Sequence, residues 1–241
     1  MMVLEKISAV IDDMPGIHGS GTYRIADRDL KIIEQYVRKD SVTAETGAGL
    51  STILFAIIGC RHTAIAPSRE EWVRIQEACR RHNISPQNIT FLDESSVDAL
   101  PRLPIGSFDF CFIDGCHGFP VACMDFYYMS RMLKIGGILG IDDVPIWACK
   151  IVVDFLHREE GWKYLVTGDK SAFFSKHLED QESREWDSQP YNAKMTKKNL
   201  RGTSFLKAFA LIPQRSHKLI RLISEGDYGA ISKRLKRLLN R

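Results

Sequence analysis

A strand that runs through a glycine turn into an apolar helix constrains the fold of this chain more than any other feature. Residues 42–45 (Val-Thr-Ala-Glu) read as a short strand, the turn Gly47-Ala48-Gly49 follows, and residues 51–58 are an apolar helix closed by Gly59. Glycines directly after a strand permit close ligand approach that a Cβ would block. A lone Gly-x-Gly is common in tight turns, but its place between a strand and a helix favours a ligand-binding turn in an α/β sheet.

The chain continues to alternate strands and helices up to about residue 175. We expect helices at residues 27–38, with Asp27 as a candidate N-cap, and at 51–58, 69–82, 119–133 and 146–157. We expect strands at residues 42–45, 62–66, 88–92, 108–113 and 138–141, a chain turn at Gly136-Gly137, and a closing hairpin from 162–166 and 171–174. The sequence therefore predicts an α/β fold with a mostly parallel seven-stranded sheet and helices on both faces.

Three regions follow from this pattern and from the length of 241 residues, which suits one main domain with an appendage. We expect an N-terminal segment at 1–26, the α/β domain at 27–175, and a linker with a basic helical appendage at 176–241. Within the last region, residues 179–187 are acidic and polar, 190–202 are polar with several lysines, and 216–223 and 230–239 have helical spacing of apolar residues.

Composition indicates a soluble protein. Hydrophobic residues make up 44% of the chain, and no apolar run approaches the roughly 18–20 residues of a membrane span. Residues 1–13 mix acids and a lysine into the apolar positions, unlike a signal peptide, so we expect a cytoplasmic protein. The six cysteines form no Cys-x-x-Cys pair and sit mostly in apolar segments, which favours reduced core residues over disulfides or zinc ligands: Cys60, Cys79, Cys111, Cys116, Cys123 and Cys149.

Charge is unevenly distributed around a net value of +3. Residues 215–241 carry eight Lys and Arg against Glu225 and Asp227. This tail could contact a nucleic acid, an acidic glycan or a membrane surface, but a solvated helix face is the favoured interpretation. We therefore expect no nucleic-acid partner, and a homo-oligomer remains open.

The carboxyl ends of the strands should hold the ligand, since doubly wound sheets bind their ligands in that crevice. Residues 45–49 end the first strand, 66–68 the second and 93–96 the third. Two later strands end in acids, the first in Asp114 and the second in Asp142-Asp143.

These strand ends resemble a known family. Residues 45–52 (Glu-Thr-Gly-Ala-Gly-Leu-Ser-Thr) resemble motif I of the class I S-adenosylmethionine methyltransferases. Residues 110–117 and 133–139, followed by Asp142-Asp143, resemble the later strands of the same group. The resemblance covers about residues 18–175 and is strongest to the bacterial methyltransferase 24 type, which is similar to macrocin and catechol O-methyltransferase-like enzymes. It implies the Rossmann-like class I methyltransferase fold and S-adenosylmethionine as cofactor.

The resemblance also implies a cofactor site. Residues matched to the methionine, ribose and adenine contacts are Glu45, Thr46, Gly47, Ala48, Gly49, Ser51, Thr52, Ser68, Ser95 and Asp114. Asp114 would face the sulfonium or the methionine amino group. Two positions depart from the family pattern, because Ala66 replaces the acid that accepts the ribose hydroxyls and Ser95 replaces the carboxylate at the adenine edge. Substitutes for these acids could be Ser68, Glu70 or Glu94.

His117 is the best candidate for a catalytic base acting with Asp114, because it follows that acid at the crevice mouth and histidine titrates near neutral pH. A loop histidine capping the next helix is an equally good interpretation. Asp114, Asp142 and Asp143 could together bind Mg²⁺ or Ca²⁺, as acids at these strand ends do in the catechol-type relatives, or the Asp-Asp pair could be a turn or helix cap.

Three further features have a structural and a functional interpretation. The aromatic and methionine residues of 126–132 suit core packing better than a substrate cage, and burial is the default for Trp147, which could otherwise form a pocket wall. Residues 18–21 (His-Gly-Ser-Gly) could fold over a cofactor or form a plain loop.

The favoured function is S-adenosylmethionine-dependent O-methylation of a small-molecule or sugar hydroxyl. A non-catalytic binding or assembly module that uses the same fold and the basic tail is the alternative. A nicotinamide-dependent oxidoreductase is disfavoured, because Thr52 stands where the third glycine of Gly-x-Gly-x-x-Gly belongs and Ala66 supplies no acid for the ribose.

Overall fold

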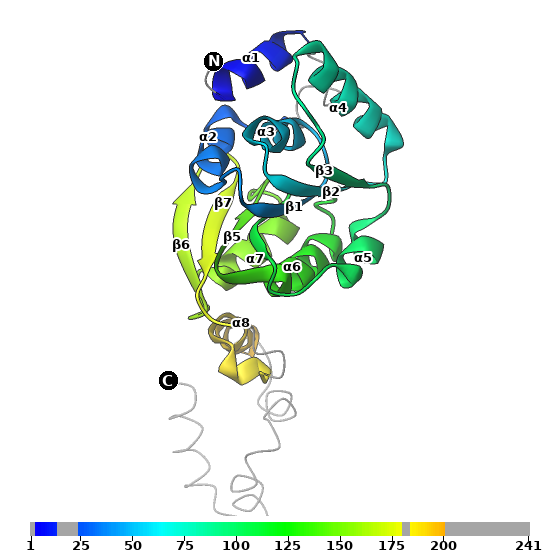
Figure 1. Ribbon diagram of the computed structural model, residues 1–241. Helices are drawn as coiled ribbons and strands as arrows, with labels where there is room; N and C mark the ends of the chain where they lie inside the picture. The colour runs from blue at the N-terminus through cyan, green and yellow to red at the C-terminus, as the bar shows by residue number, and fades with distance from the viewer. Residues whose placement is uncertain (1–2, 14–23, 180–183, 201–241) are drawn as a thin grey trace, which may run out of the picture. The chain divides into compact units, whose positions relative to one another are not determined.

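The computed structural model describes residues 3–13, 24–179 and 184–200 (Figure 1). Contacts divide the chain into two units, Met1–Ser183 and Arg184–Arg241. The proposed flap at residues 18–21 and the basic tail with its expected helices at 216–223 and 230–239 lie outside the described residues.

A seven-stranded sheet in the order β3-β2-β1-β4-β5-β7-β6 forms the centre of the first unit. Neighbouring strands from β3 to β5 are parallel, and β7 is antiparallel to both β5 and β6. The strands are β1 (Val42–Thr46), β2 (Arg61–Ile65), β3 (Ile89–Leu92), β4 (Phe108–Ile113), β5 (Leu133–Ile141), β6 (Trp162–Thr167) and β7 (Ala172–Lys176). The predicted α/β fold is confirmed, and the closing hairpin is formed by β6 and β7.

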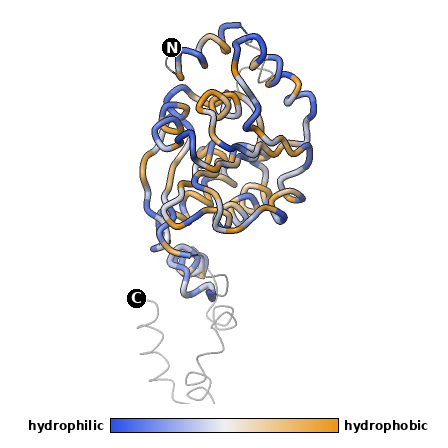
Figure 2. The backbone as a smooth tube through the Cα atoms, viewed as in Figure 1, coloured by the Kyte–Doolittle hydropathy of each residue, from blue (hydrophilic) through white to orange (hydrophobic). Residues whose placement is uncertain are grey.

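Helices cover both faces of the sheet (Figure 1). One face packs against α2 (Asp27–Tyr36), α3 (Leu50–Ile58) and α4 (Arg69–Arg81), and α1 (Val3–Asp13) packs on α3 and α2. The other packs against α5 (Ser96–Ala99), the 3₁₀ turn η2 (Leu100–Arg102), α6 (Val121–Met132) and α7 (Trp147–Leu156). Figure 2 shows that α3 is hydrophobic along its length, as expected for a helix buried next to the glycine turn. None of the described helices is both long and apolar enough to cross a membrane.

Several local expectations were wrong. Helix α1 was not predicted, although Ile7 and Val10 are buried on one side of it with helical spacing. The pair Gly136-Gly137 does not turn the chain but lies inside β5, where the register with β4 shifts. Asp27 is the first residue of α2 rather than its cap, and it pairs with Arg24.

The second unit, as far as it is described, contains the 3₁₀ turn η3 (Trp186–Ser188) and helix α8 (Pro190–Leu200). Helix α8 lies in the stretch 190–202, which the sequence marks as polar with several lysines. Pro190 begins α8, as proline often does in the first turn of a helix.

Candidate active site

A cavity of about 600 Å³ opens at the carboxyl ends of β1, β2 and β4. This volume lies within the roughly 300–1,000 Å³ range of small-molecule pockets. The cavity is lined by Ile25, Thr46, Gly47, Ala48, Gly49, Leu50, Ile65, Ala66, Pro67, Ser68, Glu71, Ser95, Ser96, Val97, Asp114, Gly115, Cys116, His117, Val121 and Asp143. Seven of the ten sequence-predicted cofactor residues are among them, all but Glu45, Ser51 and Thr52.

The glycine turn is shaped by the strand ends on either side of it. Gly47 has a φ of +89°, and a Cβ there would lie 2.2 Å from the carbonyl oxygen of Asp114, so only glycine fits. The amide of Gly47 also donates to the carbonyl of Ile65 at 2.8 Å. The turn is therefore held between the ends of β2 and β4, at the start of α3.

Glu45, Ser51 and Thr52 are buried and do not line the cavity. The Thr52 hydroxyl accepts a hydrogen bond from the Gly49 amide at 2.9 Å and donates to Oε1 of Glu45. The same Glu45 oxygen lies 3.1 Å from Nε2 of His62, a residue that sequence reasoning missed. These side chains support the glycine turn from behind, because Glu45 points into the α3 side of the sheet instead of into the crevice.

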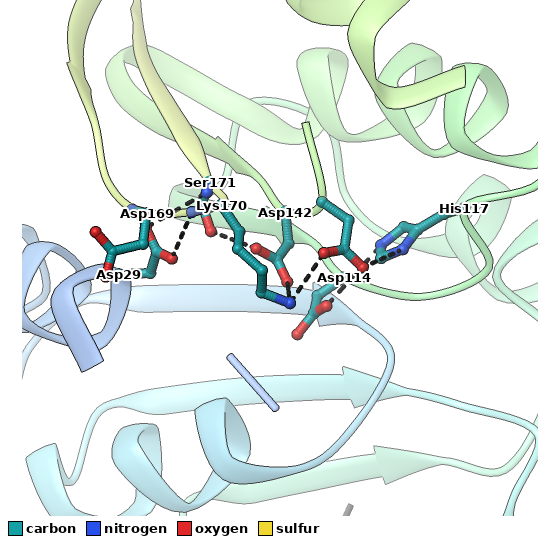
Figure 3. Close-up of polar contacts among 8 residues, drawn as sticks. Asp29, Asp114, His117, Asp142, Asp169, Lys170 and Ser171 are labelled. Atoms are coloured by element: carbon teal, nitrogen blue, oxygen red, sulfur yellow. Dashed lines mark hydrogen bonds and ion pairs between the residues drawn. The ribbon is translucent and has the colours of Figure 1, made fainter. Parts of the chain in front are cut away.

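His117 lines the cavity, and its two ring nitrogens have different surroundings. Its Nδ1 lies 3.2 Å from Oδ2 of Asp143, and its Nε2 lies 3.9 Å from Oδ1 of Asp114. Within the described part of the chain, Nε2 is buried without a hydrogen-bond partner. The imidazole of His117 thus lies at the cavity wall, next to the two acids Asp114 and Asp143 (Figure 3).

Asp114 and Asp143 have unusual settings. Burial raises the pKa of Asp114 well above its ordinary value, and the charges of Asp142 and Glu45 raise it further. Asp143 has a positive φ of 47°, in the left-handed region that aspartate tolerates better than most residues. Strained backbone of this kind is concentrated at functional sites.

Lys170, from the turn between β6 and β7, was missed by sequence reasoning. Its Nζ donates a 2.9 Å hydrogen bond to Oδ1 of Asp143 and lies 3.7 Å from Oδ2 of Asp142 (Figure 3). Burial lowers the pKa of Lys170, but the hydrogen bond to Asp143 and the charges of Asp142, Asp143 and Asp114 outweigh burial, so the net pKa is raised. Lys170 is therefore a firmly protonated cation beside the acids.

The expected metal set of Asp114, Asp142 and Asp143 does not have the geometry of a metal site. No group of three or more His, Cys, Asp or Glu side chains in the described residues is arranged to hold a metal ion. Lys170 pairs with Asp143, and the Ser171 hydroxyl donates to Oδ1 of Asp142 at 2.5 Å.

A carboxylate on α4 lines the same cavity as Ala66, the position at which the family acid is missing. Glu71 lines the cavity, and burial raises its pKa. Of the three expected substitutes, Ser68 lines the cavity but caps α4 by accepting from the Glu71 amide at 3.3 Å. Glu70 points to solvent with 88% of its side chain exposed, and Glu94 pairs with Arg102 outside the lining. Ser95 lines the cavity and caps α5.

Two aromatic side chains are exposed beside the residues that line the cavity mouth. Phe119 is 67% exposed and Trp147 is 65% exposed, with ring centroids 5.9 Å apart. The default expectation that Trp147 is buried was wrong: it is the first residue of α7, and the buried residues of that helix begin at Ala148. In residues 126–132, Met129 and Met132 belong to the core as expected.

The cysteines follow the structural interpretation with one exception. All six are free thiols, and Cys60, Cys79, Cys111 and Cys149 are buried. Cys116, by contrast, is exposed and lines the cavity.

The strand order with a reversed β7, together with a glycine turn after β1 at a large cavity, defines the class I methyltransferase fold. A family model described as a methyltransferase domain matches residues 44–144, which include the glycine turn, Asp114, His117 and the Asp142-Asp143 pair. These residues form a methyltransferase domain. A search of curated proteins gives no significant match.

Solved structures share the fold at low sequence identity. The O-methyltransferase TomG from Streptomyces achromogenes, involved in tomaymycin synthesis and solved in complex with S-adenosylmethionine, is 14% identical, with a TM-score of 0.56 over 74% of this chain and 91% of that one. An O-methyltransferase from Bacillus cereus in complex with S-adenosylhomocysteine is 15% identical, with a TM-score of 0.57 over 72% and 91%. A methyltransferase from Podospora anserina with bound S-adenosylhomocysteine is 13% identical, with a TM-score of 0.56 over 72% and 88%.

Proposed function

We propose that the protein transfers the methyl group of S-adenosylmethionine to a hydroxyl group of a small-molecule or sugar acceptor. The observation that carries this proposal is the buried, unpartnered Nε2 of His117 among the described residues, at the cavity wall and beside Asp143. A nitrogen held in this way is suited to accept the proton that a hydroxyl loses on methylation.

Two carboxylates that line the cavity support S-adenosylmethionine as its ligand. Asp114 supplies a carboxylate for a cationic group of the methionine part, next to the close-approach backbone of Gly47. Glu71 supplies the second carboxylate, which would accept hydrogen bonds from the ribose hydroxyls in place of the acid missing at Ala66. Bound in this cavity, S-adenosylmethionine would supply a methyl group on a positively charged sulfur, a good leaving group.

The residues of the chain then have two tasks in the reaction. They hold the acceptor oxygen in line with the methyl carbon, so that the new C–O bond forms as the C–S bond breaks and its electron pair returns to sulfur. His117 takes the hydroxyl proton on Nε2, and Asp143 beside Nδ1 stabilises the resulting imidazolium. The proton leaves to solvent after the product departs.

The exposed pair of Phe119 and Trp147 suggests the kind of acceptor. Phe119 lies two residues beyond His117, and Trp147 four residues beyond Asp143. Aromatic faces of this kind bind planar rings by stacking and the apolar face of sugars by contact with their C–H groups. We therefore infer an acceptor that has an aryl or sugar ring next to the hydroxyl group.

The test combines calorimetry with an acceptor screen. S-adenosylmethionine and S-adenosylhomocysteine are titrated into the protein, and S-adenosylhomocysteine release is measured with a panel of phenols and sugars. We expect binding of both ligands and turnover with at least one acceptor class. No binding of either ligand would refute the proposal, and binding without turnover across the panel would favour the non-catalytic binding module.

Variant His117→Gln tests the base. General bases contribute about 10²–10⁴-fold, so we expect kcat to fall by that factor with the affinity for S-adenosylmethionine retained. The matched control is His82→Gln, because Nε2 of His82 also lies 3.2 Å from a carboxylate, that of Asp13, but outside the cavity. Full activity of His117→Gln would end its candidacy as the base.

A further inference from the structure

The acid pair Asp142-Asp143 has a cation that belongs to the protein itself. The ammonium of Lys170 lies 2.9 Å from Asp143 and 3.7 Å from Asp142, with Asp114 on the neighbouring strand end (Figure 3). In the catechol-type relatives that the sequence resembles, acids at these strand ends bind magnesium, so a divalent ion would lie among these three carboxylates.

Three of the four carboxylate oxygens of the Asp142-Asp143 pair are already engaged. Asp143 uses Oδ1 for Lys170 and Oδ2 for His117, while Oδ1 of Asp142 accepts from Ser171. Mg²⁺ demands near-octahedral oxygen ligands at about 2.0–2.1 Å, and it would also have to sit beside an ammonium of the same sign. The residues present therefore do not fit a divalent metal.

Lys170 is held in this place by the fold. The carboxylate of Asp29, buried on α2, accepts hydrogen bonds from the backbone amides of Asp169 at 3.1 Å, Lys170 at 3.1 Å and Ser171 at 3.4 Å. Gly168 completes the contact, because a Cβ there would lie 1.6 Å from Oδ1 of Asp29. The turn that carries Lys170 is thus anchored to α2, and the ammonium is not that of a freely moving surface side chain (Figure 3).

We propose that the ammonium of Lys170 is the resident cation of the Asp142-Asp143 pair and takes the place of a divalent metal, so that this site works without one. The absence of a metal does not depend on the proposed function, but the role of Lys170 in catalysis does. In catalysis Lys170 would be a positioning residue. It balances the charge of Asp143, which in turn faces Nδ1 of His117, and the acceptor hydroxyl is activated by His117 rather than by a metal ion.

The test measures metal binding itself, so a failure of the proposed methyl transfer does not affect it. Mg²⁺ and Mn²⁺ are titrated calorimetrically into the wild type, the single variants Lys170→Gln and Asp143→Asn, and the double variant Lys170→Gln/Asp143→Asn, with no methyl donor or acceptor present. We expect no measurable binding by the wild type. Lys170→Gln should bind with a Kd at least about tenfold below the highest Kd that the calorimeter can detect, and the double variant should lose this binding. Any binding shared with Asp143→Asn lies elsewhere and is subtracted.

Lys150→Gln is the matched control, since Lys150 forms an equally close ion pair with Asp154, at 2.7 Å, but at an exposed position on α7. It should behave as the wild type. Metal binding by the wild type that Asp143→Asn abolishes overturns the proposal, and so does a Lys170→Gln variant that gains none. If Lys170→Gln does not fold without metal, its circular dichroism is compared in MgCl₂ and in NaCl of equal ionic strength. Recovery with Mg²⁺ supports the proposal, and no recovery overturns it.

Discussion

The contact between Asp29 and the turn before β7 predicts a specific energetic coupling. Asp29→Ala removes a buried charged acceptor from three backbone amides, at residues 169–171. Hydrogen bonds to charged groups contribute about 1.5–3 kcal/mol each, and the cost of burying the carboxylate offsets part of the sum, so we expect a net loss of about 3 kcal/mol. That loss corresponds to a fall in Tm of about 6–12 °C for a protein of this size.

The partner substitution is Gly168→Ala, whose Cβ would lie 1.6 Å from Oδ1 of Asp29 and 2.7 Å from its Cγ. Overpacking of this kind costs about 1–3 kcal/mol. The clash disappears when the carboxylate is absent, so Gly168→Ala should cost much less in the Asp29→Ala background. We expect a coupling of at least about 1 kcal/mol in the double-mutant cycle.

Urea unfolding followed by circular dichroism gives the four free energies of unfolding for this cycle. The control is Asp169→Ala. The Asp169 side chain is half exposed, and its ion pair with Arg28 is long, at 3.8 Å, so its loss should cost under about 0.5 kcal/mol. Costs of Asp29→Ala and Gly168→Ala that add within about 0.5 kcal/mol would refute the reasoning.

Two further predictions concern ligands. Glu71→Gln should raise the Kd for S-adenosylmethionine about tenfold or more in calorimetry, because the ribose hydroxyls lose a charged acceptor, whereas its exposed neighbour variant Glu70→Gln should leave the Kd unchanged. Equal effects of the two would contradict this role for Glu71. Trp147→Ala should raise KM for a ring-containing acceptor severalfold, because an exposed aromatic face for stacking is lost. The Kd for the cofactor should not change, since Trp147 lies outside the cavity lining. An unchanged KM would show that Trp147 is not part of the acceptor site.

The sheet was predictable from the sequence because its signals are local. The almost continuous apolar run Phe108–Ile113 and the glycine turn at Gly47 each place a strand end within a few residues. The acids Asp114 and Asp143 follow such strand ends, so they could be assigned to the crevice before the structure was known.

Side-chain direction and long-range contact were not predictable in the same way. Glu70 and Glu71 are adjacent, and the phase of α4, which starts from the Ser68 cap, turns only Glu71 toward the cavity. Asp29 contacts a turn about 140 residues away along the chain. No local sequence pattern indicates that the Lys170 amide donates a hydrogen bond to Asp29. Glu45 matched the family motif, but its position on β1 directs it to Thr52 and His62 behind the turn.

These contacts divide the acids of the crevice into two groups with different tasks. Asp142 and Asp143 are balanced by Lys170 and Ser171, which the fold supplies. Asp114 lines the cavity, and burial together with the nearby acids makes its negative charge costly there. A ligand with positive charge removes that cost, and S-adenosylmethionine has it on both its sulfonium and its amino group. Because Lys170 already pairs with Asp143, the proposed site would leave Asp114 for the charge of the methyl donor and would need no second cation from solution.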